Sequence, residues 1–325
     1  MSETKEKIIN LQKYMDSRII GQKNLVKKLL TGLLASGHIL VEGAPGLAKT
    51  KAIKTLSECI DAKYTRIQFT PDLLPSDITG SDVYIASKSA FEFHKGPIFA
   101  NLLLADEINR APAKVQSALL EAMAENQVSV GGRQYPLPEL FMVMATQNPI
   151  EQEGTYNLPE AQLDRFLMYV KIDQPDIASE QKILKLVRAE EKHLLSPNAA
   201  PLNRPKLEIS DILAARKEVL DMYMSEQVEK YLIEFIMATR NAEKYNSQMK
   251  NMIAYGASPR ATIALDKCAK INAWLENRDY VTPEDIYSVI YDVLRHRIIL
   301  SFEAQAEGYT SDDIISALIK QVPLP

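Results

Sequence analysis

A run of small residues that ends in a lysine and a threonine suits the binding of phosphate groups. Residues 43–50 read GAPGLAKT and lie between a short apolar run, 38–41, and a segment of helical periodicity, 51–60. In such a loop, backbone N–H groups and the N-terminus of the following helix attract phosphate oxygens. Lys49 would reach the β- and γ-phosphates of ATP, and Thr50 would offer its hydroxyl to Mg²⁺. A Gly/Pro turn that merely joins a strand to a helix is the alternative.

The loop departs from the usual pattern at one position. The residue before the lysine is Ala48, where this motif usually has a glycine. Alanine is small and suits the start of a helix, so we expect the backbone still to approach a phosphate closely. The predicted nucleotide-binding residues of the loop are Gly43, Ala44, Pro45, Gly46, Leu47, Ala48, Lys49 and Thr50.

Two carboxylates end the apolar run 102–105, which reads LLLA. In a parallel sheet, ligands bind at the carboxyl ends of the strands, so Asp106 and Glu107 are expected beside the phosphate loop. Asp106 would hold Mg²⁺ through water, and Glu107 would orient and polarise the attacking water. A solvated pair of acids at the end of a strand is the alternative. Together the two motifs predict ATP as the substrate and Mg²⁺ as its metal.

Strand signals alternate with helical signals in the first part of the chain. This alternation predicts a parallel sheet covered by helices on both faces. From about residue 175 the strand signal disappears, and two of the later helices have clear start signals at Ser258-Pro259 and Thr282-Pro283. We therefore expect an α/β domain over residues 1–180 and a smaller all-α domain over 181–325. The predicted strands are 38–41, 65–69, 102–105, 141–145 and 166–172.

The composition restricts the class of protein. A chain of 325 residues is longer than one hydrophobic core usually serves, and its net charge of −4 disfavours a nucleic-acid binder. The two cysteines, Cys59 and Cys268, and the four histidines have no metal-ligand spacing. The first residues are charged, and no run approaches the roughly 18 apolar residues that span a bilayer. We expect a cytoplasmic protein without a transmembrane segment.

Five separated segments make the chain resemble AAA+ ATPases, and specifically the MoxR family. They are GAPGLAKT at 43–50, DEINRAP at 106–112, ATQNP at 145–149, LPEAQLDRF at 158–166 and GASPR at 256–260. The resemblance implies a three-layer αβα nucleotide-binding domain of the P-loop AAA+ type, followed by a helical lid domain. It also implies hydrolysis of ATP to ADP and phosphate.

Four further residue roles follow from this resemblance. Asn148 matches the sensor-1 position, whose amide hydrogen-bonds the γ-phosphate or the attacking water. Arg165 matches the arginine finger, which reaches the nucleotide of a neighbouring subunit and stabilises transition-state charge. Arg260 matches sensor 2, on a lid helix that contacts the nucleotide of its own subunit. Gly21 lies in a segment that resembles the one packed on adenine.

Each of these residues also has a purely structural interpretation. Asn148 precedes a proline, where asparagine commonly forms a turn. Arg165 could form a surface ion pair with Asp164 or Glu160, and Arg260 could pair with an acid near the start of its helix. The glycine could simply connect two helices.

Two insertions are typical of this branch of the superfamily. Residues 71–97 resemble the insertion in the second helix, and residues 127–137 read as a β-hairpin around Gly131-Gly132. The second insertion resembles the hairpin that precedes sensor 1. In relatives, such hairpins face the central pore or the substrate.

The resemblance implies a ring, expected to be a hexamer, that uses ATP hydrolysis to remodel or mature protein complexes, including by insertion of metal cofactors. It also implies a protein client and a partner with a von Willebrand factor A domain. A nucleic-acid motor is one alternative, but the insertions have no basic stripe with interleaved aromatic residues. A regulatory switch that binds ATP without turnover is another, and the presence of Glu107, Asn148 and Arg165 disfavours it.

Overall fold

The computed structural model describes residues 2–149, 154–195, 203–245, 249 and 251–324, and the chain forms two compact units. Both units draw on separated stretches of the chain. The first comprises Met1–Leu30, Val41–Tyr156 and Val170–Leu213, and the second comprises Thr31–Leu40, Asn157–Tyr169 and Ala214–Pro325. The division into domains at residue 180 stays a prediction.

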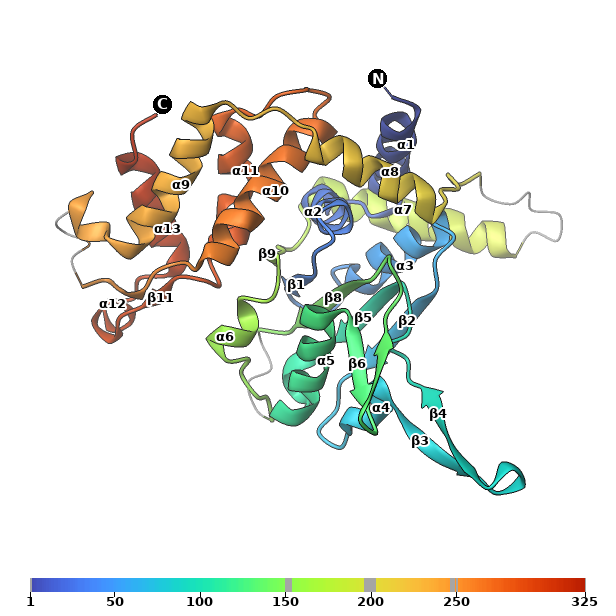
Figure 1. Ribbon diagram of the computed structural model, residues 1–325. Helices are drawn as coiled ribbons and strands as arrows, with labels where there is room; N and C mark the ends of the chain where they lie inside the picture. The colour runs from blue at the N-terminus through green and yellow to red at the C-terminus, as the bar shows by residue number, and fades with distance from the viewer. Residues whose placement is uncertain (1, 150–153, 196–202, 246–248, 250, 325) are drawn as a thin grey trace. The chain divides into compact units, whose positions relative to one another are not determined.

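A five-stranded sheet with the order β2-β5-β8-β1-β9 carries the phosphate loop (Figure 1). Strands β2, β5 and β8 run parallel, as predicted, and their register pairs Gln68 with Asp106 and Ala105 with Ala145. The apolar runs of β5 and β8 are fully buried. Both faces of a parallel sheet are covered, which explains why these strands are continuously apolar. The strands are β1 (Ile39–Glu42), β2 (Tyr64–Gln68), β5 (Leu102–Asp106), β8 (Met142–Gln147) and β9 (Met168–Lys171).

The helices of the first part of the chain present apolar faces to the sheet and to one another. Helix α3 packs on β5 and α1 packs on α3, while α5 contacts α4 and β6. Helix α3 buries Ala52, Ile53 and Leu56, the face that its periodicity predicts. These elements are α1 (Glu3–Arg18), α2 (Lys23–Leu34), α3 (Lys49–Cys59), α4 (Pro75–Thr79), η1 (Ala86–Lys88), η2 (Ile108–Arg110), α5 (Ala113–Glu125), α7 (Ile177–Leu194) and α8 (Ile209–Leu220).

Two β-hairpins occupy the predicted insertions. The predicted hairpin around Gly131-Gly132 forms from β6 (Gln127–Val130) and β7 (Arg133–Pro136), and both glycines have positive φ. The other hairpin, β3 (Gly80–Ile85) with β4 (Ala90–Lys95), extends away from the sheet (Figure 1). The rings of Phe93 and Tyr135 stack with centroids 3.9 Å apart, so the two hairpins contact each other.

The second unit is mainly helical. Helix α10 packs on α9 and α11, around a core that includes Phe235, Leu265 and Trp274. The predicted helix starts are confirmed, because the Ser258 hydroxyl accepts from the Arg260 backbone and Thr282 forms a capping box. A short antiparallel pair of strands accompanies the helices. The elements are α6 (Glu160–Leu163), α9 (Glu226–Arg240), η3 (Ala242–Lys244), β10 (Ile253–Tyr255), α10 (Pro259–Leu275), α11 (Pro283–Leu294), β11 (Ile299–Leu300), α12 (Phe302–Ala306) and α13 (Ser311–Gln321).

The expectations from composition can be compared with the described part of the chain. No helix there is long and apolar enough to cross a membrane. Cys59 and Cys268 are both buried thiols. Over the same residues, His, Cys, Asp and Glu side chains form no group of three or more that could hold a metal ion.

Candidate active site

The phosphate loop needs glycine at two positions for different reasons. A Cβ on Gly43 would lie 2.4 Å from Ile172 Cγ1, so the side chain of Ile172 leaves room only for glycine. Gly46 has a φ of +85°, which is strained for other residues. Ala48 also lies in the left-handed region, with φ 57°. Its conformation explains why glycine is usual there, and alanine bears a strain of about 1 kcal/mol.

Lys49 begins α3 and turns back over the loop. Its Nζ donates a hydrogen bond to the Gly43 carbonyl oxygen at 2.6 Å. Burial lowers the pKa of Lys49, while the nearby carboxylates of Asp106, Glu107 and Glu42 act to raise it. The ammonium group is therefore held among the loop carbonyl and three acids, where a phosphate would meet a positive charge.

The Asp106 carboxylate is fixed at the end of β5 by the two neighbouring strands. Its Oδ1 accepts from the Thr146 hydroxyl of β8 at 2.6 Å. Its Oδ2 accepts from Arg66 of β2, at 2.7 Å from Nη2 and 3.1 Å from Nε. The register of the sheet explains both contacts, since the strands end at one edge.

Glu107 follows β5 in a left-handed conformation, with φ 56°. Its backbone N–H donates to the Thr146 hydroxyl at 2.9 Å, so one buried threonine holds both acids. The carboxylate accepts from Gln68 Nε2 at 2.9 Å and pairs with Arg110 Nε at 3.0 Å, both through Oε2. These bonds direct the Glu107 carboxylate toward β2 and η2, along the edge where the strands end.

Three residues of this cluster, Arg66, Gln68 and Thr146, were not predicted from the sequence. Each lies on a strand next to β5. Arg66 and Gln68 are two positions apart on β2, so they lie on one face of the strand, and Thr146 lies two positions before Asn148. Polar residues with this spacing at the end of a predicted buried strand are the signal that could have found them.

The remaining predicted residues of the first unit also lie at the ends of elements. Asn148 is buried and directly follows β8. Gly21 has a φ of +80° and joins α1 to α2, and its Cα faces Pro175 and Ser179 at the start of α7. Gly21 lines a cavity of about 520 Å³ to which α1, α2 and α7 contribute.

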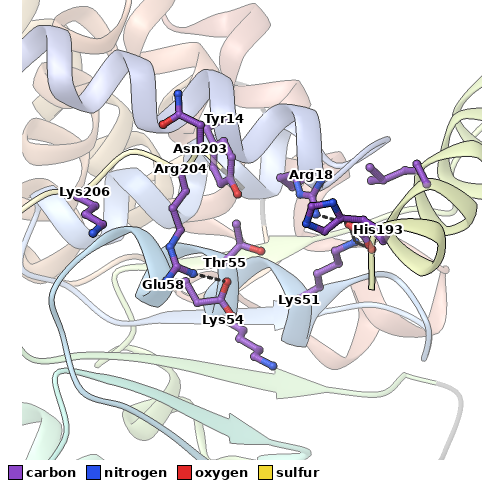
Figure 2. Close-up of a pocket in the computed structure, with 13 residues that line it drawn as sticks. Tyr14, Arg18, Lys51, Lys54, Thr55, Glu58, His193, Asn203, Arg204 and Lys206 are labelled. Atoms are coloured by element: carbon purple, nitrogen blue, oxygen red, sulfur yellow. Dashed lines mark hydrogen bonds and ion pairs between the residues drawn. The ribbon is translucent and has the colours of Figure 1, made fainter. Parts of the chain in front are cut away.

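A larger cavity of about 1010 Å³ lies between α1, α3 and α7 (Figure 2). Glu190 of α7 accepts from Arg18 at 2.6 Å and from Lys51 at 3.0 Å. Arg204 pairs with Glu58 at 3.4 Å, and Figure 2 shows this pair at another part of the wall. The two ion pairs of Glu190 tie α7 to α1 and to α3, in agreement with the grouping of α7 with the phosphate loop in the first unit.

Arg165 and Arg260 belong to the second unit. Arg260 lies in the first turn of α10 with its side chain 59% exposed, and its Nη1 lies 3.4 Å from Asp164 Oδ2. The ion pair weighed for Arg260 as an alternative is thus present. Arg165 follows Asp164 directly, and neither arginine belongs to the unit that contains the phosphate loop.

The same unit contains a buried histidine. His296 Nε2 lies 3.1 Å from the Phe166 carbonyl oxygen, so this nitrogen carries the proton and donates. Among the described residues, its Nδ1 has no hydrogen-bond partner. Burial, and then the charges of Arg297 and Arg295, hold the pKa of His296 well below its ordinary value.

This shift predicts a pH-dependent stability. The unfolded chain takes up a proton at His296 near pH 6.5 and the folded chain does not, so stability falls as pH drops below that value. Between pH 7.5 and 5.5 the wild type should lose about 1 kcal/mol more stability than His296→Gln, whose amide can still donate to Phe166. Thermal unfolding of both proteins across this range measures the difference. Parallel pH profiles would contradict it.

A phosphate loop between β1 and α3, with two fixed carboxylates at the end of β5 of a parallel sheet, defines a P-loop ATPase of the AAA+ type. The family model described as the ATPase family associated with various cellular activities (AAA) matches residues 38–168. The model of the AAA lid domain matches residues 246–318. The chain belongs to the MoxR family of AAA+ ATPases.

Relatives of this family match nearly the whole chain. Chaperone MoxR1 of Mycobacterium tuberculosis is 43% identical over 94% of this chain and 79% of its own length. Protein MoxR of Paracoccus denitrificans is 30% identical over 94% of this chain and 93% of its own. A crystal structure of a Cytophaga hutchinsonii protein is 46% identical, with a TM-score of 0.89 over 99% of this chain and 96% of its own. The predicted family, fold class and ATPase activity are thereby confirmed.

Proposed function

We propose that this ATPase works as a hexameric ring of identical subunits that remodels or matures client protein complexes. The observation that carries the proposal is the fixed position of Glu107 beside the phosphate loop, held by Gln68, Arg110 and Thr146. A carboxylate held this rigidly suits turnover rather than mere binding of ATP. The M. tuberculosis relative is named a chaperone, which supports the remodelling of client proteins as the function.

The residues of the first unit would bind and activate the substrate. The backbone of residues 43–48 surrounds the phosphates, and Lys49 neutralises their charge. The Thr50 hydroxyl and the Asp106 carboxylate provide the hard oxygen ligands that Mg²⁺ prefers, and Asp106 Oδ1 keeps a second lone pair beside its bond to Thr146. Bound Mg²⁺ supplies neutralisation of the charge on the β- and γ-phosphates.

The hydrolytic step would depend on three side chains. Glu107 orients and polarises the water that attacks the γ-phosphate, and Asn148 hydrogen-bonds that water or the phosphate. Arg165 reaches the nucleotide of the neighbouring subunit and stabilises the charge that develops in the transition state. Arg260 contacts the nucleotide of its own subunit, and Gly21 lies at the adenine.

The two hairpins would transmit the conformational change driven by ATP hydrolysis to a client protein. Tyr84 and Phe91 on β3 and β4 are 55% and 68% exposed, and their rings contact each other. The Phe93–Tyr135 stack joins this hairpin to β6–β7, which follows α5 directly in the chain. A movement that starts at Glu107 and α5 can therefore reach an exposed aromatic surface.

A protein client is favoured over a nucleic acid. Lys88 at the hairpin turn pairs with Glu92 at 2.6 Å, and Lys95 lies over the ring of Phe99. These cations therefore already have partners in or next to the insertion, and the net charge of the chain is −4. The family resemblance suggests a partner with a von Willebrand factor A domain, and insertion of a metal cofactor as one form of maturation.

Assembly-dependent hydrolysis is the expected result that tests the proposal. The specific ATPase activity should rise with protein concentration, because each active site needs Arg165 from a second subunit. Phosphate release measured over a range of concentrations, with sedimentation velocity in Mg²⁺-ATP, follows activity and assembly together. A constant specific activity from a monomer would contradict the shared site and favour a monomeric ATPase or switch.

A further inference from the structure

Arg297 uses four of the five donors of its guanidinium group on one turn of the chain. Its side chain is 3% exposed, and the residue follows the end of α11. Its Nε donates to Asp164 Oδ1 at 2.7 Å, and Nη2 donates to the carbonyl oxygens of Phe166 at 2.6 Å and Asp164 at 3.3 Å. Its Nη1 donates to the carbonyl oxygens of Leu167 at 3.1 Å and Val293 at 2.6 Å. All five donors of an arginine are thereby engaged.

The two residues before Arg297 hold the same stretch. His296 Nε2 donates to the Phe166 carbonyl oxygen, and Arg295 Nη1 donates to the Tyr169 carbonyl oxygen at 3.1 Å. Three consecutive residues therefore bind the backbone of residues 164–169. Arg165, the proposed arginine finger, lies within this stretch.

Asp164 connects the turn to the helix that carries Arg260. Its carboxylate accepts from the Ser258 hydroxyl at 3.0 Å and 3.2 Å, and Ser258 is the N-cap of α10. Arg260 Nη1 lies 3.4 Å from the same carboxylate. One acid thus joins the turn of Arg165, the start of α10 and Arg297.

Stability alone is a poor explanation for this arrangement. A buried ion pair repays its desolvation only in part, and apolar residues of similar size often stabilise a protein as well or better. A planar arginine bound to three backbone carbonyls of one turn fixes its conformation in a way that no apolar residue can. Misplacement of a catalytic group by about 1 Å can cost a 100-fold loss of rate.

We propose that Arg297 is a positioning residue, which fixes the turn of residues 164–167 and so directs Arg165 toward the neighbouring subunit. Asp164 transmits the same constraint to α10. The inference rests on the proposed function, in which Arg165 acts in trans.

Arg297→Lys tests it, because lysine keeps the charge and loses the planar set of five donors. We expect kcat to fall about 10- to 100-fold with the KM for ATP unchanged, since the phosphate loop is untouched. Equal mixing with Glu107→Gln subunits should restore part of the activity, because those subunits supply a correctly directed Arg165. Arg278→Lys is the matched control, since Arg278 pairs with buried Asp285 in the same unit, and its kcat should be retained.

The outcomes separate the inference from the proposed function. If mixed Arg165→Ala and Glu107→Gln subunits recover activity but Arg297→Lys and Glu107→Gln subunits do not, Arg297 does not direct Arg165 and the inference is wrong. An unchanged kcat for Arg297→Lys also overturns it. If the Arg165→Ala mixture itself fails, the shared site is wrong and the inference falls with it. If Arg297→Lys does not fold, Asp164→Asn is tested by the same assays and is expected to lower kcat in the same way. The backbone amides of residues 164–169 should then exchange hydrogen faster than in the wild type.

Discussion

Replacing Glu107 with glutamine is expected to lower the kcat for ATP hydrolysis about 100- to 10,000-fold while ATP still binds. Glutamine has nearly the same shape and can keep contacts with Gln68 and Thr146, so the site should remain folded. What is lost is the charge that polarises the attacking water. The phosphate loop and Lys49 are unchanged, so the binding of ATP should change little.

Phosphate release and equilibrium binding of a fluorescent ATP analogue measure the two properties separately. Glu121→Gln, at an exposed position of α5, is the matched control and should retain both. Lys49→Ala should instead lose binding, because it removes the positive charge that faces the phosphates. Retention of more than a tenth of the wild-type kcat by Glu107→Gln would show that another group activates the water.

Replacing Arg165 with alanine is expected to lower kcat about 1,000-fold or more, the effect typical of an arginine finger. ATP binding to the subunit that carries the substitution should be retained, because its own phosphate loop is intact. Mixing with Glu107→Gln subunits should restore activity. In a ring of randomly mixed subunits, about one quarter of the interfaces would pair an intact Glu107 with an intact Arg165.

The control for this mixture is the double variant Arg165→Ala/Glu107→Gln. Mixed with Arg165→Ala subunits, it provides no intact Arg165 and should restore nothing. Recovery in that mixture would show that the gain comes from assembly alone. Wild-type activity of Arg165→Ala would show that Arg165 is not part of the active site. The ordering of Arg165 by Arg297 would then have no role in catalysis.

The two largest expected effects thus involve residues of different units. Glu107 is fixed by strands of the first unit, whereas Arg165 lies in a turn that the second unit holds through Arg297. In the proposed ring, ATP hydrolysis would therefore depend on assembly. The mixing experiment therefore tests the proposed ring: recovery of activity supports it, and a failure to recover contradicts it.

The sequence by itself determined the features that are encoded locally. The strand-loop-helix order around residues 43–50, the apolar run that ends in Asp106, and the Gly131-Gly132 hairpin each depend on residues within a few positions of one another. Helix starts at Ser258 and Thr282 are likewise local, because an N-cap binds backbone groups two or three residues away. Local patterns of this kind can be recognised without knowledge of the tertiary structure.

Only the tertiary structure decided which side chains hold these features in place. Arg66 and Thr146 each lie 40 residues from Asp106 in sequence, and they meet it because the strand order puts β2 and β8 on either side of β5. Arg297 lies 133 residues from Asp164. Sequence spacing can mark such residues as candidates but does not show which of them pair, because the pairing depends on sheet register and on the burial of polar groups.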